Sequence, residues 1–487
     1  MPKLRAAAVL TTTALVLVPA VAQAAPSTPP RAGAAGIGDP YFPLDGNGGY
    51  DVQHYDLDVR YDPRTNVLQG VATIEARATH SLSSFNLDFV RPLTVRSVTV
   101  ERRAASWRRT GSELKVVPRA ALRNGSRFVV TVVYDGVPRT QQDALGFSGF
   151  FHTDDGALAV GQPDVAATWF PSNDHPSDAA SVAVSITVPA GVEGVSNGLL
   201  VGQTTRRGWT TWEWRAAEPM ATYLVVLAIG QFKLRQYTRP TGQQGGGQLR
   251  FVDALDPDLF KPDGEGPSRG EIAEKALARQ PEIIGFLEGF FGAYPFRSAG
   301  GIVDDEARLQ FALETQTRPI YSGAFFDDEL AAQLVVVHEY AHMWFGDDLR
   351  LARWQDIWLN EGFATYAEWL WLEEQGLSTA KAQFDERFAL PTNHPLWTVQ
   401  IGNPGAATDK LFHPAVYERG AMTLHALRVR IGDQRFFELL RAWAATQSGD
   451  TVTTPEFVAL AERIAGQQLD AFFGQWLFTA RKPAPTV

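Results

Sequence analysis

The chain has 487 residues, of which 45% are hydrophobic and 20% charged, a globular composition that excludes wholesale disorder and fibrous repeats. Its formal net charge of −10 would repel phosphates, so we expect no nucleic-acid partner. The sequence has no cysteine, so stability must come from buried cores or bound ligands and not from disulfides.

The first 24 residues have the pattern of a secretory signal peptide. Lys3 and Arg5 form a short positive region, an apolar run follows, and residues 22–24 (Ala-Gln-Ala) offer a small-x-small cleavage site. The apolar run is short and ends at Pro19, which disfavours a spanning helix, and no second apolar span follows. We expect cleavage near Ala24 and a secreted protein without stable membrane insertion.

The first half of the chain has the patterns of a β domain behind a lead-in. Residues 25–40 are small residues, Pro and Gly, and are expected to be flexible. Apolar and polar side chains then alternate with a period of two in three stretches: residues 55–61, 128–134 and 182–188. With an apolar strand expected at 223–231, residues 41–235 are predicted to form an antiparallel β domain.

The second half changes to helical periodicity. The glycine-rich segment 241–248 predicts a hairpin tip or a linker. Helical patterns are then found in four stretches: residues 271–291, 327–345, 360–375 and 421–446. The predicted fold class is therefore α+β, with a mainly helical domain over residues 236–487 that carries the chemistry.

The pentapeptide at residues 338–342, His-Glu-Tyr-Ala-His, has the spacing of a metal site. On a helix, residues four apart lie on one face, so His338 and His342 can reach a single ion. The residues before this motif are apolar all round, as in a buried helix. Buried histidines and a glutamate are costly unless something pairs with them, which favours a bound zinc ion over a chance match.

Zinc with an open catalytic position needs a third protein ligand. One zinc-binding pattern places a third histidine ten residues after His338, but Asp348 stands at that position. The same pattern needs a helix-breaking glycine where this chain has Phe345. Glu361 follows His342 after 18 intervening residues, a spacing that allows a second helix to return its first turn to the metal. We favour Glu361 and keep Asp348 as the alternative.

At these residues the sequence resembles the gluzincin metallopeptidases, and specifically the M1 aminopeptidase family. The resemblance is carried by residues 338–346 and 354–364, by a tyrosine motif at 416–421, and by N-terminal signatures at 169–176 and 220–224. It implies a saddle-like or sandwich-like β domain followed by a thermolysin-like catalytic domain. It also implies removal of N-terminal residues from peptide substrates by zinc-assisted hydrolysis.

The resemblance assigns roles that also have physical reasons. His338, His342 and Glu361 would hold one zinc ion per chain. Glu339 would accept the proton of the attacking water and later donate it to the leaving amine. Tyr417 would donate a hydrogen bond to the oxyanion of the tetrahedral intermediate.

Substrate binding rests on two further residues. Glu314 lies 24 residues before His338, at the position where the family binds the substrate α-amine, although the flanking Gly and Asn of the family motif are missing. Gln162 matches a second amine-binding residue of the family, but the spacing between Gln162 and the Trp-Phe-Pro motif at 169–171 is shorter than usual. Glu368, seven residues after Glu361 on the same helical face, is a candidate for orienting a zinc histidine, with a solvated glutamate as the alternative.

Three functions compete. The leading interpretation is a secreted zinc aminopeptidase. The second interpretation is a zinc endopeptidase or tripeptide-releasing peptidase with an open cleft. It is suggested by the altered segment around Glu314 and by a chain that ends ten residues after a stretch resembling the end of the catalytic domain. An inactive metal-binding scaffold is the third interpretation, and the presence of Glu339 and Tyr417 argues against it.

Overall fold

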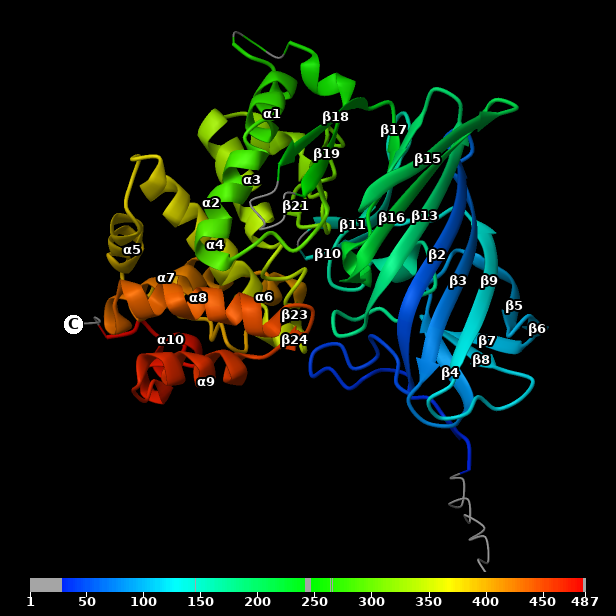
Figure 1. The fold of residues 1–487 in the computed structure, drawn as a ribbon, viewed down its shortest axis with the longest axis horizontal. Helices are drawn as coiled ribbons and strands as arrows, with labels where there is room; N and C mark the ends of the chain where they lie inside the picture. Colours follow the sequence, from blue (N-terminus) through cyan, green and yellow to red (C-terminus); the bar gives the residue numbers. More distant parts are fainter. Residues whose placement is uncertain (1–28, 145, 241–246, 263, 265, 485–487) are drawn as a thin grey trace, which may run out of the picture.

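The architecture comes from a computed structural model, which describes residues 29–484 apart from 145, 241–246, 263 and 265. The β-rich half lies beside the helical half, on the right and left of Figure 1 respectively. The predicted α+β class is confirmed. The predicted signal peptide lies outside the described residues.

Three sheets build the N-terminal half. The largest has the strand order β15 (Leu199–Arg206), β16 (Trp209–Ala221), β13 (Ala179–Pro189), β2 (Tyr50–Asp62), β3 (Val67–Ala78), β9 (Arg127–Gly136), β5 (Thr94–Val100) and β6 (Arg103–Ala104). A second has the order β1 (Arg31–Ala32), β4 (Leu82–Asp88), β8 (Glu113–Val117) and β7 (Ser106–Thr110). The third has the order β10 (Thr140–Asp143), β11 (Gly146–His152), β12 (Ala157–Val160), β17 (Leu227–Gly230) and β14 (Glu193–Val195).

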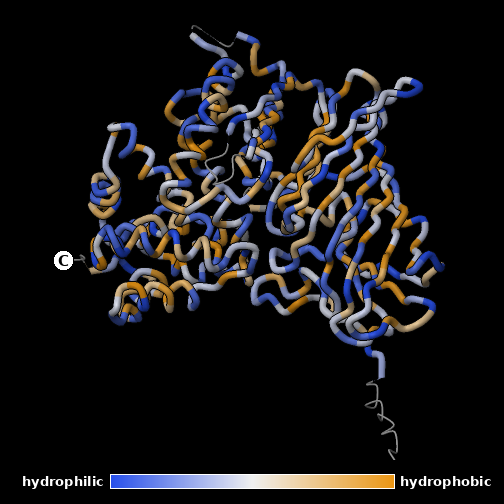
Figure 2. The backbone as a smooth tube through the Cα atoms, viewed as in Figure 1, coloured by the Kyte–Doolittle hydropathy of each residue, from blue (hydrophilic) through white to orange (hydrophobic). Residues whose placement is uncertain are grey.

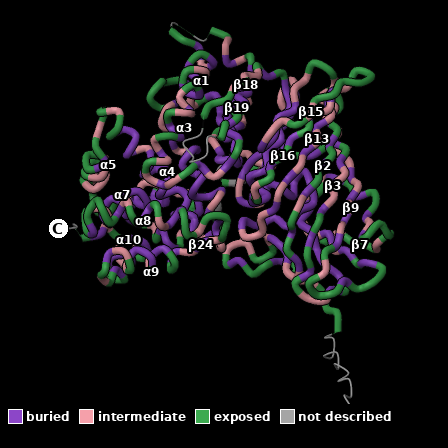
Figure 3. The backbone as a smooth tube through the Cα atoms, in the orientation of Figure 1, coloured by how far each residue is buried: buried purple, intermediate pink, exposed green. Residues whose placement is uncertain are grey.

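The period of two in the sequence explains the large sheet. The three alternating stretches lie within β2, β9 and β13, where buried and more exposed residues alternate. Figures 2 and 3 show the same alternation of hydropathy and burial along these strands. The apolar faces pack into the core, which is why this pattern specifies the register. The expected strand at 223–231 is shorter, because a 3-10 turn, η2 (Thr222–Leu224), precedes β17.

The lead-in contains ordered contacts that its composition did not indicate. β1 pairs with β4, and the side chain of Asp39 is buried. Asp39 accepts a hydrogen bond from the backbone N–H of Trp354 at 3.0 Å, and the ring of Phe42 meets that of Trp354 edge-on. The segment 33–49 therefore joins the N-terminal sheets to the catalytic half.

A mixed sheet begins the catalytic half. Its order is β18 (Lys233–Pro240), β19 (Gln248–Leu255), β20 (Ser298–Asp304), β22 (Ile320–Ser322) and β21 (Ala312–Leu313). The boundary predicted between residues 235 and 236 falls within β18, which pairs with β19 along its whole length. Strands β18 and β19 are antiparallel, and residues 241–246 of the predicted hairpin tip or linker lie outside the described residues.

Ten α-helices and several 3-10 turns make up most of the described remainder. The helices are α1 (Arg269–Leu277), α2 (Gln280–Phe291), α3 (Glu329–Ala341), α4 (Trp358–Glu374), α5 (Ala380–Phe388), α6 (Thr408–Leu411), α7 (Pro414–Ile431), α8 (Asp433–Gln447), α9 (Thr454–Ala465) and α10 (Asp470–Leu477). The turns are η1 (Ala166–Thr168), η3 (Pro257–Phe260), η4 (Gly323–Phe326), η5 (Trp354–Asp356) and η6 (Pro395–Trp397), and β23 (Arg350–Leu351) pairs with β24 (Thr451–Val452). None of the described helices combines the length and hydropathy needed to cross a bilayer.

Two expected helices are each divided. The stretch 271–291 forms α1 and α2, with Pro281 in the first turn of α2, where proline is tolerated. The stretch 421–446 forms parts of α7 and α8, because Gly432 has a φ of 81° and ends α7.

Helix packing positions the chemistry. Asp328 caps α3 by accepting the N–H groups of Leu330 and Ala331, both at 2.9 Å. Helices α4 and α7 cross so closely that a Cβ added to Gly362 would lie 2.9 Å from the Cα of Gly420. Glycine at both positions therefore allows the two helices to present side chains to one cavity.

Candidate active site

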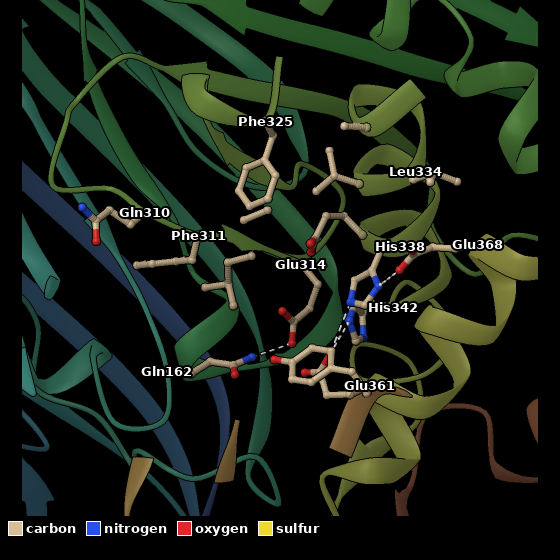
Figure 4. A pocket seen from close by; sticks show the side chains of 16 residues that line it. Gln162, Gln310, Phe311, Glu314, Phe325, Leu334, His338, His342, Glu361 and Glu368 are labelled. Atoms are coloured by element: carbon tan, nitrogen blue, oxygen red, sulfur yellow. Dashed lines mark hydrogen bonds and ion pairs between the residues drawn. The ribbon is translucent and has the colours of Figure 1, made fainter. Parts of the chain in front are cut away.

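Two histidines and a glutamate converge where α3 meets α4. His338 lies in the last turn of α3, His342 follows its end, and Glu361 lies in the first turn of α4. The Oε2 atom of Glu361 is 3.3 Å from Nε2 of His338 and 3.4 Å from Nε2 of His342. Figure 4 shows the three side chains pointing toward one another at the wall of a cavity.

The donor set fits zinc. Zinc lies about 2.0–2.2 Å from histidine nitrogens and carboxylate oxygens in tetrahedral sites, so two ligand atoms are separated by roughly 3.3–3.5 Å. The observed separations of 3.3 and 3.4 Å match that edge length. One ligand atom from each of the three residues lies within 4.8 Å of the others. Two imidazoles and one carboxylate are also a common ligand set of catalytic zinc.

Hydrogen bonds orient both imidazoles toward this point. Nδ1 of His338 donates to Oε1 of Glu368 at 2.7 Å, and Nδ1 of His342 donates to the carbonyl oxygen of Phe345 at 2.9 Å. A carbonyl oxygen can only accept, so Nδ1 of His342 carries the proton and Nε2 is free to ligate. Glu368, on α4, therefore orients the ring of His338, which is one of the two roles considered for it from the sequence.

The charges of the cluster compensate one another. Burial raises the pKa of Glu361, but the adjacent His342 and His338 outweigh burial, and the pKa lies below its usual value. Burial lowers the pKa of His342, whereas Glu361 and Glu314 raise it, with a net rise to about 9. A cation in this pocket is thus favoured by its surroundings, whether a proton or a metal ion.

Glu339 lies on α3 between the two histidines, and its carboxylate lies near Glu314 and His342. It is 5% exposed, and a carboxylate oxygen lies within 4.8 Å of ligand atoms of both Glu314 and His342. Burial raises the pKa of Glu339 to about 8, against the lowering effect of His338 and His342. A buried carboxyl group with this pKa can both take up and release a proton.

Asp348, the alternative third ligand, lies elsewhere. Its Oδ1 atom accepts the backbone N–H of Gly449 at 3.1 Å, and among the described residues it belongs to none of the groups that could hold a metal. The geometry therefore brings Glu361, and not Asp348, to the two histidines.

A second carboxylate faces the cavity from the other side. Oε1 of Glu314, just after edge strand β21, accepts hydrogen bonds from Nε2 of Gln162 at 2.6 Å and from the hydroxyl of Tyr223 at 3.1 Å. Gln162 comes from the loop between β12 and η1, so the predicted substrate-binding pair is in contact. Tyr223, which belongs to the signature at 220–224, was given no role at the sequence level.

Tyr417 completes the wall of the cavity. Its ring stacks on the imidazole of His338 with a centroid separation of 6.0 Å and an interplanar angle of 23°. The close crossing of α4 and α7 brings it beside Glu361. Its ring therefore lies beside the converging histidines, in the wall of the same cavity.

Two cavities adjoin at this place. One, of about 490 Å³, is lined by all seven residues that the sequence predicted: Gln162, Glu314, His338, Glu339, His342, Glu361 and Tyr417. The other, of about 270 Å³, shares Gln162 and Tyr417 and is lined by aromatic side chains from distant segments: Phe147, Phe311 and Phe412. The sequence reasoning missed Phe147 and Phe412, which no motif marks.

Comparisons with known proteins agree with this geometry. The chain matches the peptidase M1 N-terminal domain over residues 51–224 and the peptidase family M1 domain over residues 322–476. It is similar to a crystal structure of an M1 zinc metallopeptidase from Deinococcus radiodurans bound to the substrate Tyr-Ser-Ala, with a TM-score of 0.78 and 30% identity over 93% of this chain and 99% of that one.

Curated relatives are more distant and longer. Aminopeptidase M1 of Arabidopsis thaliana is 24% identical over 68% of this chain and 37% of its own length. Glutamyl aminopeptidase of Rattus norvegicus is 25% identical over 76% of this chain and 39% of its own length. The chain therefore spans less than half the length of these relatives.

Proposed function

Because the chain belongs to peptidase family M1, we propose that it is a zinc aminopeptidase, which hydrolyses the first peptide bond of substrates with a free N-terminus. The observation that carries the proposal is the placement of Glu314. Its carboxylate lines the same cavity as the converging His338, His342 and Glu361. A cationic α-amine bound by Glu314 would bring the first peptide bond near those three residues.

The three converging residues would hold one zinc ion per chain. A zinc ion bound there supplies a Lewis acid for peptide hydrolysis. Glu368 and the carbonyl of Phe345 keep the imidazoles in the ligating orientation through the two Nδ1 hydrogen bonds. This outer support agrees with a site built to retain a metal.

The remaining chemistry is assigned to the chain's own side chains. Glu339 takes the proton of the attacking water and passes it to the leaving amine, which its burial beside His342 supports. Tyr417 donates a hydrogen bond to the substrate oxygen that gains negative charge. Gln162 binds the α-amine through its side-chain oxygen while its amide nitrogen holds Glu314.

The second cavity indicates which N-terminal residue is preferred. It adjoins the amine-binding Gln162 and is lined by Phe147, Phe311 and Phe412, and none of its described lining residues is charged. A large apolar or aromatic first side chain would bury its surface there, whereas an acidic one would lose hydration without a partner. Higher kcat/KM for N-terminal Phe than for Asp is the expected result.

The test of the proposal compares a free tripeptide, Phe-Ala-Ala, with its N-acetylated form. Acetylation removes the ammonium charge, so kcat/KM should fall strongly. Glu314→Ala should lower kcat/KM of the free peptide about tenfold to a hundredfold, the worth of a charge-assisted hydrogen bond of about 1.5–3 kcal/mol. Glu306→Ala is the matched control, because that carboxylate pairs with Arg308 and is not among the described residues lining either cavity.

Two outcomes would contradict the proposal, the first its reaction and the second its amine-binding residue. One is efficient hydrolysis of acetylated peptides at internal bonds, which would support the endopeptidase alternative. The other is an unchanged preference for free peptides after Glu314→Ala, which would move the amine site elsewhere.

We also infer from residues 1–24 that the enzyme is exported and cleaved near Ala24. The N-terminal sequence of the protein recovered from its producing cells tests this. Recovery of an intact Met1 terminus would contradict it.

A further inference from the structure

Glu314 is held by two hydrogen bonds that come from the N-terminal half of the chain. Gln162 and Tyr223 both donate to Oε1 of Glu314, and neither bond uses Oε2. Because the terminal torsion of a glutamate is broad, a single donor leaves the carboxylate free to turn. Two donors to the same oxygen hold Oε1 in place and restrict that rotation.

The two donors differ in their access to substrate. Gln162 lines both cavities and can touch a bound peptide. Tyr223 is 3% exposed and is not among the described residues that line either cavity. Tyr223 therefore does not face a substrate in either cavity, and its hydroxyl reaches the substrate through Glu314.

The backbone next to Tyr223 and the ring of Tyr223 are each held by a contact. On the N-terminal side, the hydroxyl of Thr222 donates to Asp174 at 2.6 Å. On the catalytic side, the ring packs against the indole of Trp354 with centroids 5.4 Å apart. Trp354 lies in η5, four residues before α4, and its backbone N–H is bound by Asp39. The hydroxyl of Tyr223 thus sits at a defined place between the two halves.

We propose that Tyr223 is a positioning residue for the exopeptidase reaction, which fixes the Glu314 carboxylate so that it binds the substrate α-ammonium. This proposal rests on the amine-binding role assigned to Glu314 under the proposed function. The ammonium is present in both the ground state and the transition state, so the hydroxyl contributes to binding and not to the chemical step. Free-amine specificity is therefore supplied in part by the N-terminal half.

The experiment measures KM and kcat for a free-amine tripeptide in five proteins. These are wild type, Tyr223→Phe, Tyr134→Phe, Glu314→Ala and the double variant that combines Tyr223→Phe with Glu314→Ala. Tyr134 is the matched control, because its hydroxyl is buried in the same half and has no hydrogen-bond partner in the described structure.

Tyr223→Phe should raise KM about tenfold with kcat changed less than about twofold, as expected for loss of one hydrogen bond to a charged group. Tyr134→Phe should leave both constants unchanged. In the Glu314→Ala background, adding Tyr223→Phe should change KM less than about twofold, because the hydroxyl acts through the missing carboxylate. Zinc content should match that of the Tyr134→Phe protein.

Three results would overturn the proposal. KM of the Tyr223→Phe protein could equal that of wild type. The Tyr223→Phe effect could persist in full in the Glu314→Ala background, which would indicate a general structural role. A fall in kcat with unchanged KM would place the hydroxyl in the chemical step. If the proposed function itself were wrong, the wild-type protein would not discriminate free from acetylated peptides, and this result is distinct from the three above.

Discussion

Replacing Glu361 by glutamine should weaken zinc binding by more than a hundredfold. The carboxylate is almost fully buried, and its Oε2 atom lies 3.3 and 3.4 Å from the two imidazole Nε2 atoms. Glutamine keeps the shape but loses the negative charge that a Zn²⁺ ligand supplies. Loss of an outer partner such as Glu368 typically costs about tenfold to a hundredfold in metal affinity, so loss of a ligand should exceed about 2.8 kcal/mol.

The assay is competition for zinc with a chelator of known affinity, read by elemental analysis of the protein fraction. Glu368→Gln should fall between Glu361→Gln and wild type, because it removes the charge that accepts the Nδ1 proton of His338. Asp348→Asn is the matched carboxylate-to-amide control and should retain wild-type affinity, since Asp348 bonds to Gly449 instead. Zinc loss by Asp348→Asn together with retention by Glu361→Gln would refute the ligand assignment.

Three further predictions concern the proton carrier, the oxyanion donor and the segment that joins the two halves. Glu339→Gln should retain zinc but lose most turnover, because an amide cannot take up a proton; normal kcat would remove Glu339 from the mechanism. Tyr417→Phe should lower kcat about a hundredfold to a thousandfold with little change in KM, and near-normal kcat would return this ring to a packing role. Burial raises the pKa of Asp39, but hydrogen bonds from His175 and from backbone N–H groups including that of Trp354 outweigh burial and lower it to about 2. Since the folded pKa lies below the unfolded value of 3.8, the carboxylate stabilises the fold above about pH 4, and that contribution is lost as pH falls toward 2. Asp39→Asn should therefore lower the free energy of unfolding by on the order of 2 kcal/mol at neutral pH, with the difference from wild type shrinking between pH 4 and pH 2 in denaturant titrations. A difference that stays constant across this range would show that the charge of Asp39 is not responsible.

Local spacing was sufficient to predict the histidine pair, whereas Glu314, Gln162 and Tyr417 were assigned from the resemblance to the M1 family. His338 and His342 lie four residues apart on one helix face, and this relation holds in any buried helix. The position of Glu368 two turns after Glu361 allowed either a bond to a zinc histidine or a solvated side chain, and the structure has the bond to His338. The α+β class followed in the same way from the change of period between the two halves.

What the sequence did not reveal depends on contacts between distant segments. Phe147 and Phe412 meet at the second cavity although 264 residues separate them in the chain, and no motif marks either. Asp39 lies in a segment of small residues that reads as flexible, yet its partners include His175 and Trp354. The two divided helices do have local signals in the sequence, because Pro281 begins α2 and Gly432 ends α7.

The central claim is that Glu314 restricts cleavage to the free N-terminus of a peptide. The most direct measurement is a mass-spectrometric time course on an unblocked peptide of about ten residues that begins with several large apolar residues. We expect a ladder of products, each shorter by one N-terminal residue, and no such ladder when the same peptide is N-acetylated. Internal fragments or released tripeptides from either form would contradict it.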